Sequence, residues 1–444
     1  MLPSILLPLG SAVLAASSVL AAKCGRGSSC SEDEPCCSQY GECGVGAYCL
    51  GGCDPRFSFS LDSCVPEPVC QSRTLSMNSL DRVQSIEKYL GDPSEADWVS
   101  SGDPLVYKDT VLLTMPKYKA GTVLASTVYV WYGNVKARMK SSRGNGVVSA
   151  FILLSDVKDE IDFEFIGADL ETVQTNYYYQ ANPVWTNSQN ITDLSDTYNN
   201  FHDYEIQWTP DQVVWLVDGK VGRTLKKSDT WNATTNQFDF PQTPARVQLS
   251  IWPGGNATNS EYTIEWAGGE IDWNSDDIQS YGYDFATFSD VSIECYNATS
   301  APGTNKGKGY YYNNAAGTND TVVDGDKPTV LASLMGTGTD MDAGASSASA
   351  SSSSSGANSV PGGTSGVGVG NVVGGDGSGS GDASSGGSST SSSADCAATG
   401  FTVDCNSDSG SGSSSSSGAV GGNDKVFGAS AFAAIIAFVF LAWL

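Results

Sequence analysis

One short run of residues alternates carboxylic acids with apolar side chains. Residues 159–167 read DEIDFEFIG in one-letter code. A period of two predicts a strand, on which Glu160, Asp162 and Glu164 share one face while the apolar residues between them share the other. Like charges on one sheet face repel each other. The row therefore indicates a functional site, and the alternative is the polar outer face of an ordinary amphipathic strand.

Such a row suits the cleavage of glycosidic bonds with retention of configuration. In that chemistry one carboxylate attacks the anomeric carbon and a second, protonated carboxyl group donates to the leaving oxygen, with the two groups about 5 to 5.5 Å apart. Residues four apart on a strand have Cα atoms about 13 Å apart, and two glutamates leaning inward close most of that distance. We therefore predict Glu160 and Glu164 as the pair, with Asp162 assisting by separating their pKa values.

The surrounding sequence predicts the elements that must hold this row. From about Asp81 to Tyr296, short β-rich runs recur between turns, which favours a β-sandwich. An Asp-Gly turn at Asp218 and Gly219 joins two of the runs as a hairpin. The clearest runs are residues 110–113, 127–131, 150–154, 204–208, 213–217 and 246–250.

The acid row and its neighbours resemble a known family. EIDFE at 160–164 resembles the Glu-x-Asp-x-Glu signature of glycoside hydrolase family 16, and residues 75–300 look like the Crh family of fungal wall transglycosylases. This resemblance implies a jelly roll whose concave sheet forms the substrate cleft, with Glu160 as nucleophile and Glu164 as acid/base. The segments that carry it are YGNV at 132–135, GVVSAF at 146–151, VQTNY at 173–177, FHDY at 201–204, SIWPGG at 250–255 and TIEWAGG at 263–269.

Aromatic side chains are the expected platforms for sugar rings, because the C–H faces of sugars stack on them. Half of the candidates are expected in the core instead. The resemblance favours Trp252, Thr263 and Arg223 as sugar contacts. The aromatic candidates are Tyr177, Tyr178, Trp185, Trp215, Trp252 and Trp266.

Composition excludes several classes of function. The net charge is −26, from 49 acids against 23 bases, which disfavours nucleic acids and anionic membranes as partners. His202 is the single histidine, so we expect no metal site rich in histidine and predict a structural or subsite role for it. We expect no cofactor and a monomeric enzyme.

The amino-terminal region predicts a secreted, cross-linked module. Residues 1–22 are apolar and end in small residues, which is typical of a signal peptide. Seven cysteines then crowd into about 30 residues of a segment, 23–70, too short to bury a core of its own. PCCSQYGECG at 35–44 resembles the hevein-type, family 18 chitin-binding module. That resemblance implies sugar contacts from Ser38, Tyr40 and Tyr48, although Glu42 replaces a usual aromatic residue, and it implies the bridges Cys24–Cys37, Cys30–Cys43 and Cys36–Cys49.

The remaining cysteines are assigned by position. Cys64 and Cys70 flank a short turn and are expected to pair with each other. Counting then leaves Cys53 with Cys295 as its partner in the folded region. A catalytic domain is expected over residues 75–300.

The carboxyl-terminal third predicts a stalk and an anchor. Residues 301–417 are expected to form a flexible, glycosylated Ser/Gly stalk, in which Cys396 and Cys405 close a local loop. Residues 418–444 look like a signal for a glycosylphosphatidylinositol (GPI) anchor, with attachment near Gly418, and a tail-anchored helix is the alternative. N-glycosylation sequons occur at Asn190, Asn232, Asn256, Asn297 and Asn319.

Together these features predict a GPI-anchored, extracellular enzyme on the outer face of the plasma membrane and in the cell wall. The resemblance implies cleavage of chitin and transfer of the chain to β-1,3/1,6-glucan or chitin. The alternatives are an endo-β-glucanase or chitinase that hydrolyses its substrate, and a non-catalytic wall lectin or adhesin.

Overall fold

The computed structural model describes residues 22–182, 184–345 and 360–361. Most of the predicted signal peptide, most of the predicted stalk, Cys396, Cys405 and the predicted anchor site at Gly418 lie outside these residues. No helix within the described ranges is long and apolar enough to cross a membrane.

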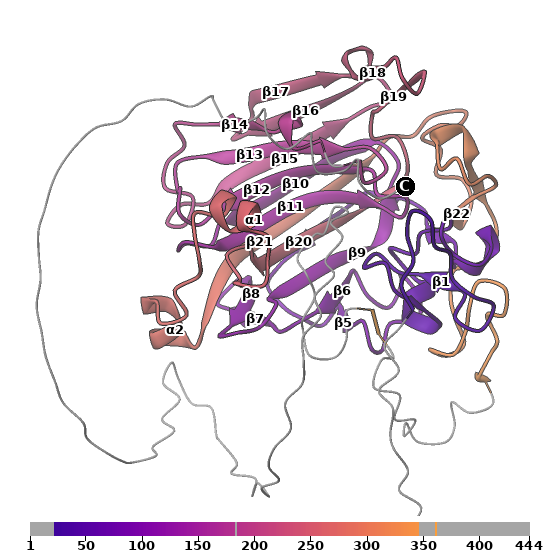
Figure 1. Cartoon of the computed structure of the whole chain (residues 1–444), viewed down its shortest axis with the longest axis horizontal. Helices are drawn as coiled ribbons and strands as arrows, with labels where there is room; N and C mark the ends of the chain where they lie inside the picture. Colours follow the sequence, from indigo (N-terminus) through magenta and orange to yellow (C-terminus); the bar gives the residue numbers. More distant parts are fainter. Residues whose placement is uncertain (1–21, 183, 346–359, 362–444) are drawn as a thin grey trace, which may run out of the picture. The chain divides into compact units, whose positions relative to one another are not determined.

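Two eight-stranded sheets form a jelly-roll β-sandwich (Figure 1). We call the sheet that contains the acid row the front sheet. In spatial order, it contains β14 (Gln189–Ile191), β13 (Val173–Tyr178), β12 (Glu160–Ile166), β11 (Val147–Ser155), β20 (Ala245–Pro253), β9 (Thr122–Val130), β6 (Trp98–Ser101) and β5 (Val83–Ser85).

The second sheet, called the back sheet, covers one face of the front sheet. Two short helices, α1 (Glu261–Trp266) and α2 (Asp276–Tyr281), lie between β20 and β21 in the chain. The back sheet contains, in order, β17 (Lys220–Lys226), β16 (Gln212–Val217), β15 (His202–Trp208), β10 (Gly133–Lys140), β21 (Tyr283–Cys295), β8 (Thr110–Pro116) and β7 (Pro104–Tyr107), with β4 (Arg73–Ser76) also paired to β21.

The hydrophobic core lies between the two sheets and packs against the apolar face of strand β12. The rings of Phe163 and Phe165 are buried and pack against Tyr204 of the back sheet, with centroids 5.4 and 4.7 Å away. Trp215, which is also fully buried, donates from Nε1 to the carbonyl oxygen of Asp162 at 3.0 Å. Because the apolar face of β12 is committed to this core, the three acids must project from the opposite face.

The amino-terminal module is small and cross-linked by disulfides, and it shares a hydrophobic cluster with the sandwich. It contains β1 (Cys36–Cys37), β2 (Cys43–Gly44), η1 (Gly46–Cys49) and η2 (Leu61–Ser63). Its disulfides are Cys24–Cys37, Cys30–Cys43 and Cys36–Cys49, the same three pairs that the hevein resemblance implies.

The expected Cys64–Cys70 bridge is wrong, and so is the inferred Cys53–Cys295 bridge. The structure pairs Cys53 with Cys64 and Cys70 with Cys295. Strand β4 begins three residues after Cys70 and pairs with the end of β21, so Cys70 is carried to Cys295. Cys64 stays with the module, where the next residue donates its backbone N–H to Cys49. Pairing between neighbours in sequence could not anticipate this strand pairing.

The stalk does not begin at residue 301 as expected. Strand β22 (Gly309–Tyr312) pairs with β23 (Val322–Gly325) and with the hinge strand β3 (Glu67–Pro68). Tyr310 and Tyr312 of this segment are buried in the main core. In Figure 1 this orange segment lies beside the indigo module. Hydrogen bonds such as that from Gly46 N–H to the carbonyl oxygen of Gly336 join the two. Aromatic residues within a glycine-rich stretch thus extend the fold to about residue 345.

Candidate active site

The acid row lies in the middle of the front sheet, on the face opposite the core, which we call the acid face. The side chain of Asp162 is fully buried, Glu160 is 4% exposed and Glu164 is half-buried. Each acid has one neighbour on β11 and one on β13. The neighbours are Leu154 and Tyr178 for Glu160, Ile152 and Asn176 for Asp162, and Ala150 and Gln174 for Glu164.

Burial and mutual repulsion set the protonation of the row. Burial raises the pKa of Glu160 and of Glu164 well above their usual range, and the charge of Asp162 raises both further. Burial also raises the pKa of Asp162 to about 7, against the opposing effect of the Arg223 charge. These shifts favour the protonated form of both glutamates, as the proton donor of the row requires, and they couple the titration of each glutamate to that of Asp162.

One half-buried cation, Lys158, distinguishes the two glutamates. Lys158 lies in the turn before β12, with its backbone in the left-handed region at φ 66°. Its positive charge lowers the pKa of Glu160, opposing burial and the two neighbouring acids, whereas the pKa of Glu164 is governed by burial and by Asp162. Glu160 is thus the member better suited to carry the negative charge, and Glu164 the member better suited to hold the proton.

A second row of polar side chains lies on the acid face, on strand β20. Its members are Arg246, Gln248, Ser250 and Trp252, and all are at least nine-tenths buried. Among the described residues, Arg246 Nε, Gln248 Oε1, Ser250 Oγ and Trp252 Nε1 find no hydrogen-bond partner, as do both carboxylate oxygens of Asp162. Buried polar atoms are normally paired, so this row marks a surface built to receive polar groups.

Sequence reasoning identified only Trp252 from this row. The signal was present, because residues 246–252 alternate polar or aromatic residues with Val247, Leu249 and Ile251. A period of two assigns the first set to one sheet face. The alternation therefore predicts the polar face of this strand as well as the strand itself.

Aromatic rings lie at the Glu164 end of the acid face. Trp252 stacks against Trp266 of α1, with centroids 5.8 Å apart and planes 24° apart. Trp266 donates from Nε1 to Gln174 Oε1 at 2.9 Å, and Gln174 is the cross-strand neighbour of Glu164. Trp252 is 8% exposed and packs in a small cluster with Val148, Ala267 and Trp266, so its role as a sugar contact stays a prediction. Thr263 lies on the same short helix as Trp266, where it pairs with the capping residue Ser260.

The other predicted contacts are distributed differently. Arg223 is 7% exposed and lies between the sheets, where it donates to the carbonyl oxygens of Thr175 and Asn187. Thr175 pairs with Phe163 and so belongs to the core face. This placement does not fit a sugar contact, because the guanidinium ties the two sheets together behind the acids. Of the aromatic candidates, Tyr177 and Trp215 are in the core, Tyr178 neighbours Glu160, and Trp185 is exposed.

The module residues expected to bind sugar are partly engaged within the protein. Ser38 is buried and its Oγ accepts from the backbone N–H groups of Tyr40 and Glu42. Tyr48 is also buried, and its hydroxyl donates to the carbonyl oxygen of Val360. Tyr40 remains half-buried.

The remaining candidates lie apart from the acid face. His202 belongs to the back sheet, and both of its ring nitrogens are hydrogen bonded, one to Asp218 and the other to Ser195. The sulfurs of Cys24, Cys30 and Cys43 lie close together, but all three are in disulfides and cannot act as thiolate ligands. Among the sequons, Asn190 and Asn297 are exposed, and Asn232, Asn256 and Asn319 are half-buried.

Comparison with known proteins places this geometry in a family. The model of glycosyl hydrolases family 16 matches residues 92–280. Crh-like protein 3 of Botryotinia fuckeliana is 64% identical over 327 residues, which cover 74% of this chain and 73% of that protein. Crh-like protein 2 of Aspergillus fumigatus is 52% identical over 333 residues, covering 74% and 75%. A solved structure, Crh5 transglycosylase in complex with NAG, is 29% identical, covers 61% of this chain and 99% of that chain, and has a TM-score of 0.49.

Proposed function

We propose that this protein, which belongs to the Crh-like proteins of glycosyl hydrolase family 16, cleaves chitin with retention and transfers the cleaved polysaccharide to β-glucan or chitin. Membership of that family makes it a cell-wall glycosyl hydrolase or transglycosylase. The observation that carries this proposal is the acid row, in which Glu160, Asp162 and Glu164 share one face of β12. Burial and the neighbouring acids raise the pKa of Glu160, and the Lys158 charge partly opposes that rise.

The proposed reaction has two displacements. The Glu160 carboxylate attacks the anomeric carbon, the glycosidic C–O bond breaks, and Glu164 gives its proton to the leaving oxygen. The product of this step is a glycosyl ester on Glu160. Glu164, now ionised, then takes the proton of an incoming hydroxyl group, whose oxygen attacks the anomeric carbon and releases Glu160.

Asp162 is proposed to tune this exchange rather than to react. Its side chain lies between the two glutamates on the same face, and its charge raises the pKa of both. A protonated Asp162 would favour the ionised form of Glu160 in the first step. An ionised Asp162 would favour the reprotonation of Glu164 in the second step.

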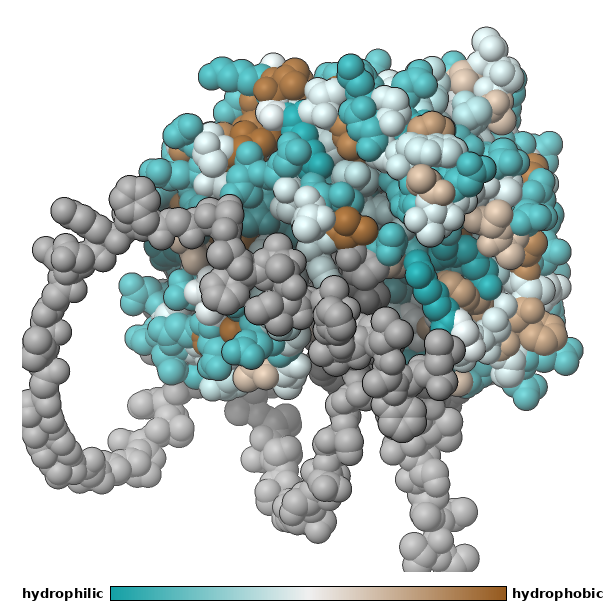
Figure 2. Space-filling model, turned by 45° about the horizontal axis from the view of Figure 1, so that its top comes forward, coloured by the Kyte–Doolittle hydropathy of each residue, from teal (hydrophilic) through white to brown (hydrophobic). Residues whose placement is uncertain are grey.

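The surface around the acid row suits a neutral polymer. The β20 row offers hydrogen-bond donors and acceptors, while Arg246 is its one cationic member. The visible described surface in Figure 2 is mostly hydrophilic, with hydrophobic side chains in small separate groups. Hydroxyl and amide groups of chitin and β-glucan fit such a surface better than the charged groups of anionic polysaccharides do.

The ends of the chain support a location at the cell surface. We propose secretion through the segment 1–22 and GPI attachment near Gly418, which would hold the enzyme at the outer face of the plasma membrane where new wall polymers emerge. The hevein-like module would add affinity for N-acetylglucosamine polymers.

A labelled-acceptor experiment tests the proposal. The purified ectodomain is mixed with chitin oligomers and fluorescent β-1,3-glucan oligomers, and products are identified by mass spectrometry. We expect labelled chitin–glucan hybrids without any added nucleotide sugar or metal, and none from Glu160→Gln. Shortened chitin chains that do not change when acceptor is added would assign hydrolysis instead. Chitin binding without any new product would assign a lectin.

A further inference from the structure

We propose that Gln39 of the amino-terminal module is a positioning residue of the acid face, where it holds Arg246 and Gln248 as a subsite for the amide group of a sugar chain. This inference rests on the proposed function. It makes the module one end of the substrate surface, in addition to any role in tethering the enzyme to chitin.

The strand register places Arg246 and Gln248 in line with the acids. Arg246 pairs with Leu154, which pairs with Glu160, and Gln248 pairs with Ile152, which pairs with Asp162. Neighbouring strands are about 4.8 Å apart, so strand β20, which carries these two residues, lies about 10 Å from β12 across the sheet. A sugar chain that crosses the strands over the acids passes over them.

The module reaches this point through Gln39. Gln39 Oε1 accepts a hydrogen bond from Arg246 Nη2 at 2.9 Å and another from Gln248 Nε2 at 3.3 Å. One oxygen therefore fixes two donors of the front sheet. Because both Gln39 contacts are donors, the Gln248 amide is oriented with Oε1 directed elsewhere.

Two glycines allow the module to approach this closely. A Cβ atom at Gly51 would lie 2.5 Å from Arg246 Nη1, and a Cβ atom at Gly52 would lie 2.9 Å from Nη2. The backbone N–H of Gly52 also donates to Asp156 Oδ1 at 2.8 Å, which anchors the same loop to the sandwich. The guanidinium of Arg246 is thus held between the module backbone and Gln39.

The atoms left unpaired by this arrangement identify the ligand. Arg246 Nε is a donor and Gln248 Oε1 is an acceptor, and neither has a hydrogen-bond partner in the described part of the chain. The side chains of Arg246 and Gln248 are 6% and 1% exposed, so their unpaired atoms are costly. An acetamido group carries one C=O and one N–H, which complement this donor and acceptor. An unsubstituted glucose unit has no such group.

Beyond Arg246 the module covers the acid face. A cavity of about 30 Å³ lies there, bounded by Leu50 and Gly51 of the module and by Tyr129 and Arg246 of the sandwich. The sugar chain therefore meets the module after it passes Gln248. The subsite is the last one on this side of the acid row.

Binding measured without turnover tests the inference. In a Glu160→Gln background, the Kd of chitin oligomers from the trimer to the hexamer is measured by calorimetry, with and without Gln39→Ala. We expect the long oligomers to bind about 5- to 10-fold more weakly in the double variant, which is the loss of about one hydrogen bond, and the trimer to be unaffected. Gln39→Glu, which keeps the accepting oxygen, should restore the long oligomers.

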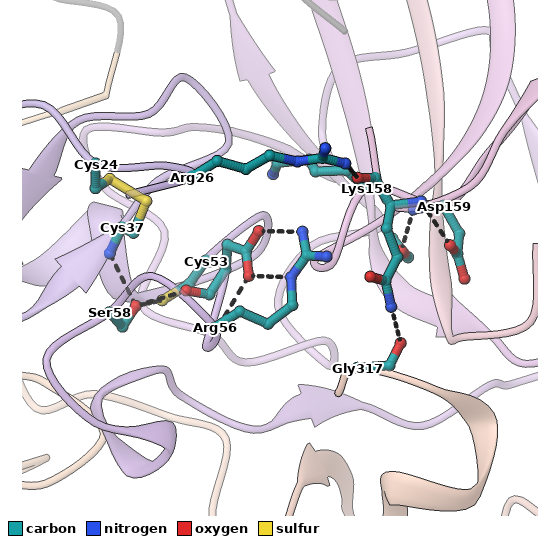
Figure 3. Close-up of polar contacts among 12 residues, drawn as sticks. Cys24, Arg26, Cys37, Cys53, Arg56, Ser58, Lys158, Asp159 and Gly317 are labelled. Atoms are coloured by element: carbon teal, nitrogen blue, oxygen red, sulfur yellow. Dashed lines mark hydrogen bonds and ion pairs between the residues drawn. A yellow bond between two sulfur atoms is a disulfide. The ribbon is translucent and has the colours of Figure 1, made fainter. Parts of the chain in front are cut away.

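A matched control removes a different contact between module and sandwich. Arg26 donates to the carbonyl oxygen of Gln180, and Figure 3 shows the Arg26 side chain extending toward Lys158 and Asp159. The N–H of Gln180 in turn donates to Asp159 Oδ1. Arg26→Ala should leave the length dependence unchanged. Gln248→Met, which removes the acceptor in a similar volume, should weaken only the long oligomers.

Three results would overturn the inference. The first is an unchanged length dependence in Gln39→Ala, and the second is an equal weakening for every oligomer. The third is Gln39→Ala and Arg26→Ala having the same effect, since that would assign Gln39 to docking alone. These readouts use an inactive enzyme, so a failure of transfer by the wild type would contradict the proposed function without deciding this one.

Discussion

The acid face and the junction between module and sandwich each bury carboxyl groups side by side. On the acid face the group consists of Glu160, Asp162 and Glu164. At the junction it consists of Glu67 of the hinge, 4% exposed, and Asp156 of the sandwich, 2% exposed. Burial raises the pKa of every member of both groups. A raised pKa therefore does not by itself identify the catalytic site.

The hydrogen bonds separate the two groups. Asp156 accepts from the Tyr129 hydroxyl at 2.7 Å and from the Gly52 N–H at 2.8 Å, and the Arg246 charge lowers its pKa against the effect of burial. Burial, the Asp156 charge and the side-chain interaction with Asp156 all raise the pKa of Glu67, which favours its protonated form. At the junction the proton therefore stays on Glu67.

The carboxyl groups of the acid face are not divided in this way into one hydrogen-bonded carboxylate and one protonated acid. Asp162, with a pKa of about 7, has no partner in the described structure for either oxygen. Its proton can move when the charge on Glu160 or Glu164 changes. The difference between the regions is thus between a proton held for stability and protons free to be exchanged during a reaction.

The largest expected effect comes from Glu164→Gln. Loss of the proton donor should slow transfer from chitin about 10²- to 10⁴-fold, because the leaving sugar oxygen then departs unprotonated. An aryl glycoside with an acidic phenol needs no proton and should keep its first step, measured as a burst of released phenol. Equal losses on both substrates would contradict the donor role. Glu294→Gln, an exposed acid on the back sheet, is the matched control.

Asp162→Asn should have a smaller effect, about tenfold on kcat, with a shift of the pH profile. The Asp162 charge raises the pKa of Glu160 and of Glu164, so its removal lowers both. The acidic limb, where Glu160 must lose its proton, and the basic limb, where Glu164 must keep one, should both move to lower pH. A profile of kcat/KM against pH checks this shift, and limbs that stay in place would exclude the tuning role.

Much of the catalytic arrangement could be predicted because it depends on local periodicity. The alternation in residues 159–167 was enough to place three acids on one face, and the sandwich core confirms the assignment of Phe163 and Phe165 to the other. The jelly roll was likewise predicted from recurring strands and from the family resemblance. The pattern and the structure agree because a strand has only two faces.

The rest depends on contacts between residues far apart in the sequence. The Cys70–Cys295 bridge spans 225 residues and follows from the β4–β21 pairing, which no local pattern contains. The Gln39–Arg246 hydrogen bond spans 207 residues. Arg223 was predicted as a sugar contact from the family resemblance, which does not show that its guanidinium donates to Thr175 and Asn187 behind the acids. Residues 301–345 were expected to be part of the stalk because of their overall composition. That average hides the few tyrosines whose burial allows the segment to pack against the core.

Glu67→Gln should stabilise the protein, by an amount that grows with pH. The pKa of Glu67 is raised by burial and by the Asp156 charge, so the folded state binds a proton more tightly than the unfolded state. Wild-type stability therefore falls as pH rises above the unfolded value of about 4.3, by at most about 1.4 kcal/mol per pH unit until the folded pKa is passed. The variant lacks this loss.

Thermal unfolding at several pH values checks this prediction. The difference in Tm between Glu67→Gln and the wild type should be small near pH 4 and larger near pH 7. Turnover of short oligomers should not change, because Glu67 lies outside the acid face. A constant Tm difference across this range would mean that Glu67 is ionised in the folded protein, and the contrast between the two carboxyl groups would then fail.

The smallest expected effect tests whether the junction region also binds chitin. Tyr40 is the one member of the predicted sugar-contacting set in the module that remains half-buried rather than buried. An aromatic contact with a sugar ring is worth about 0.5–1.5 kcal/mol, so Tyr40→Ala should weaken retention on insoluble chitin about 3- to 10-fold. Turnover of soluble trimers should stay the same, since the side chain is not part of the acid row. Pull-down with the Glu160→Gln protein separates binding from cleavage, and Tyr107→Ala, a tyrosine of the back sheet, is the control. If both variants were retained equally, the module would have no role in retention on chitin and would only form one end of the acid face.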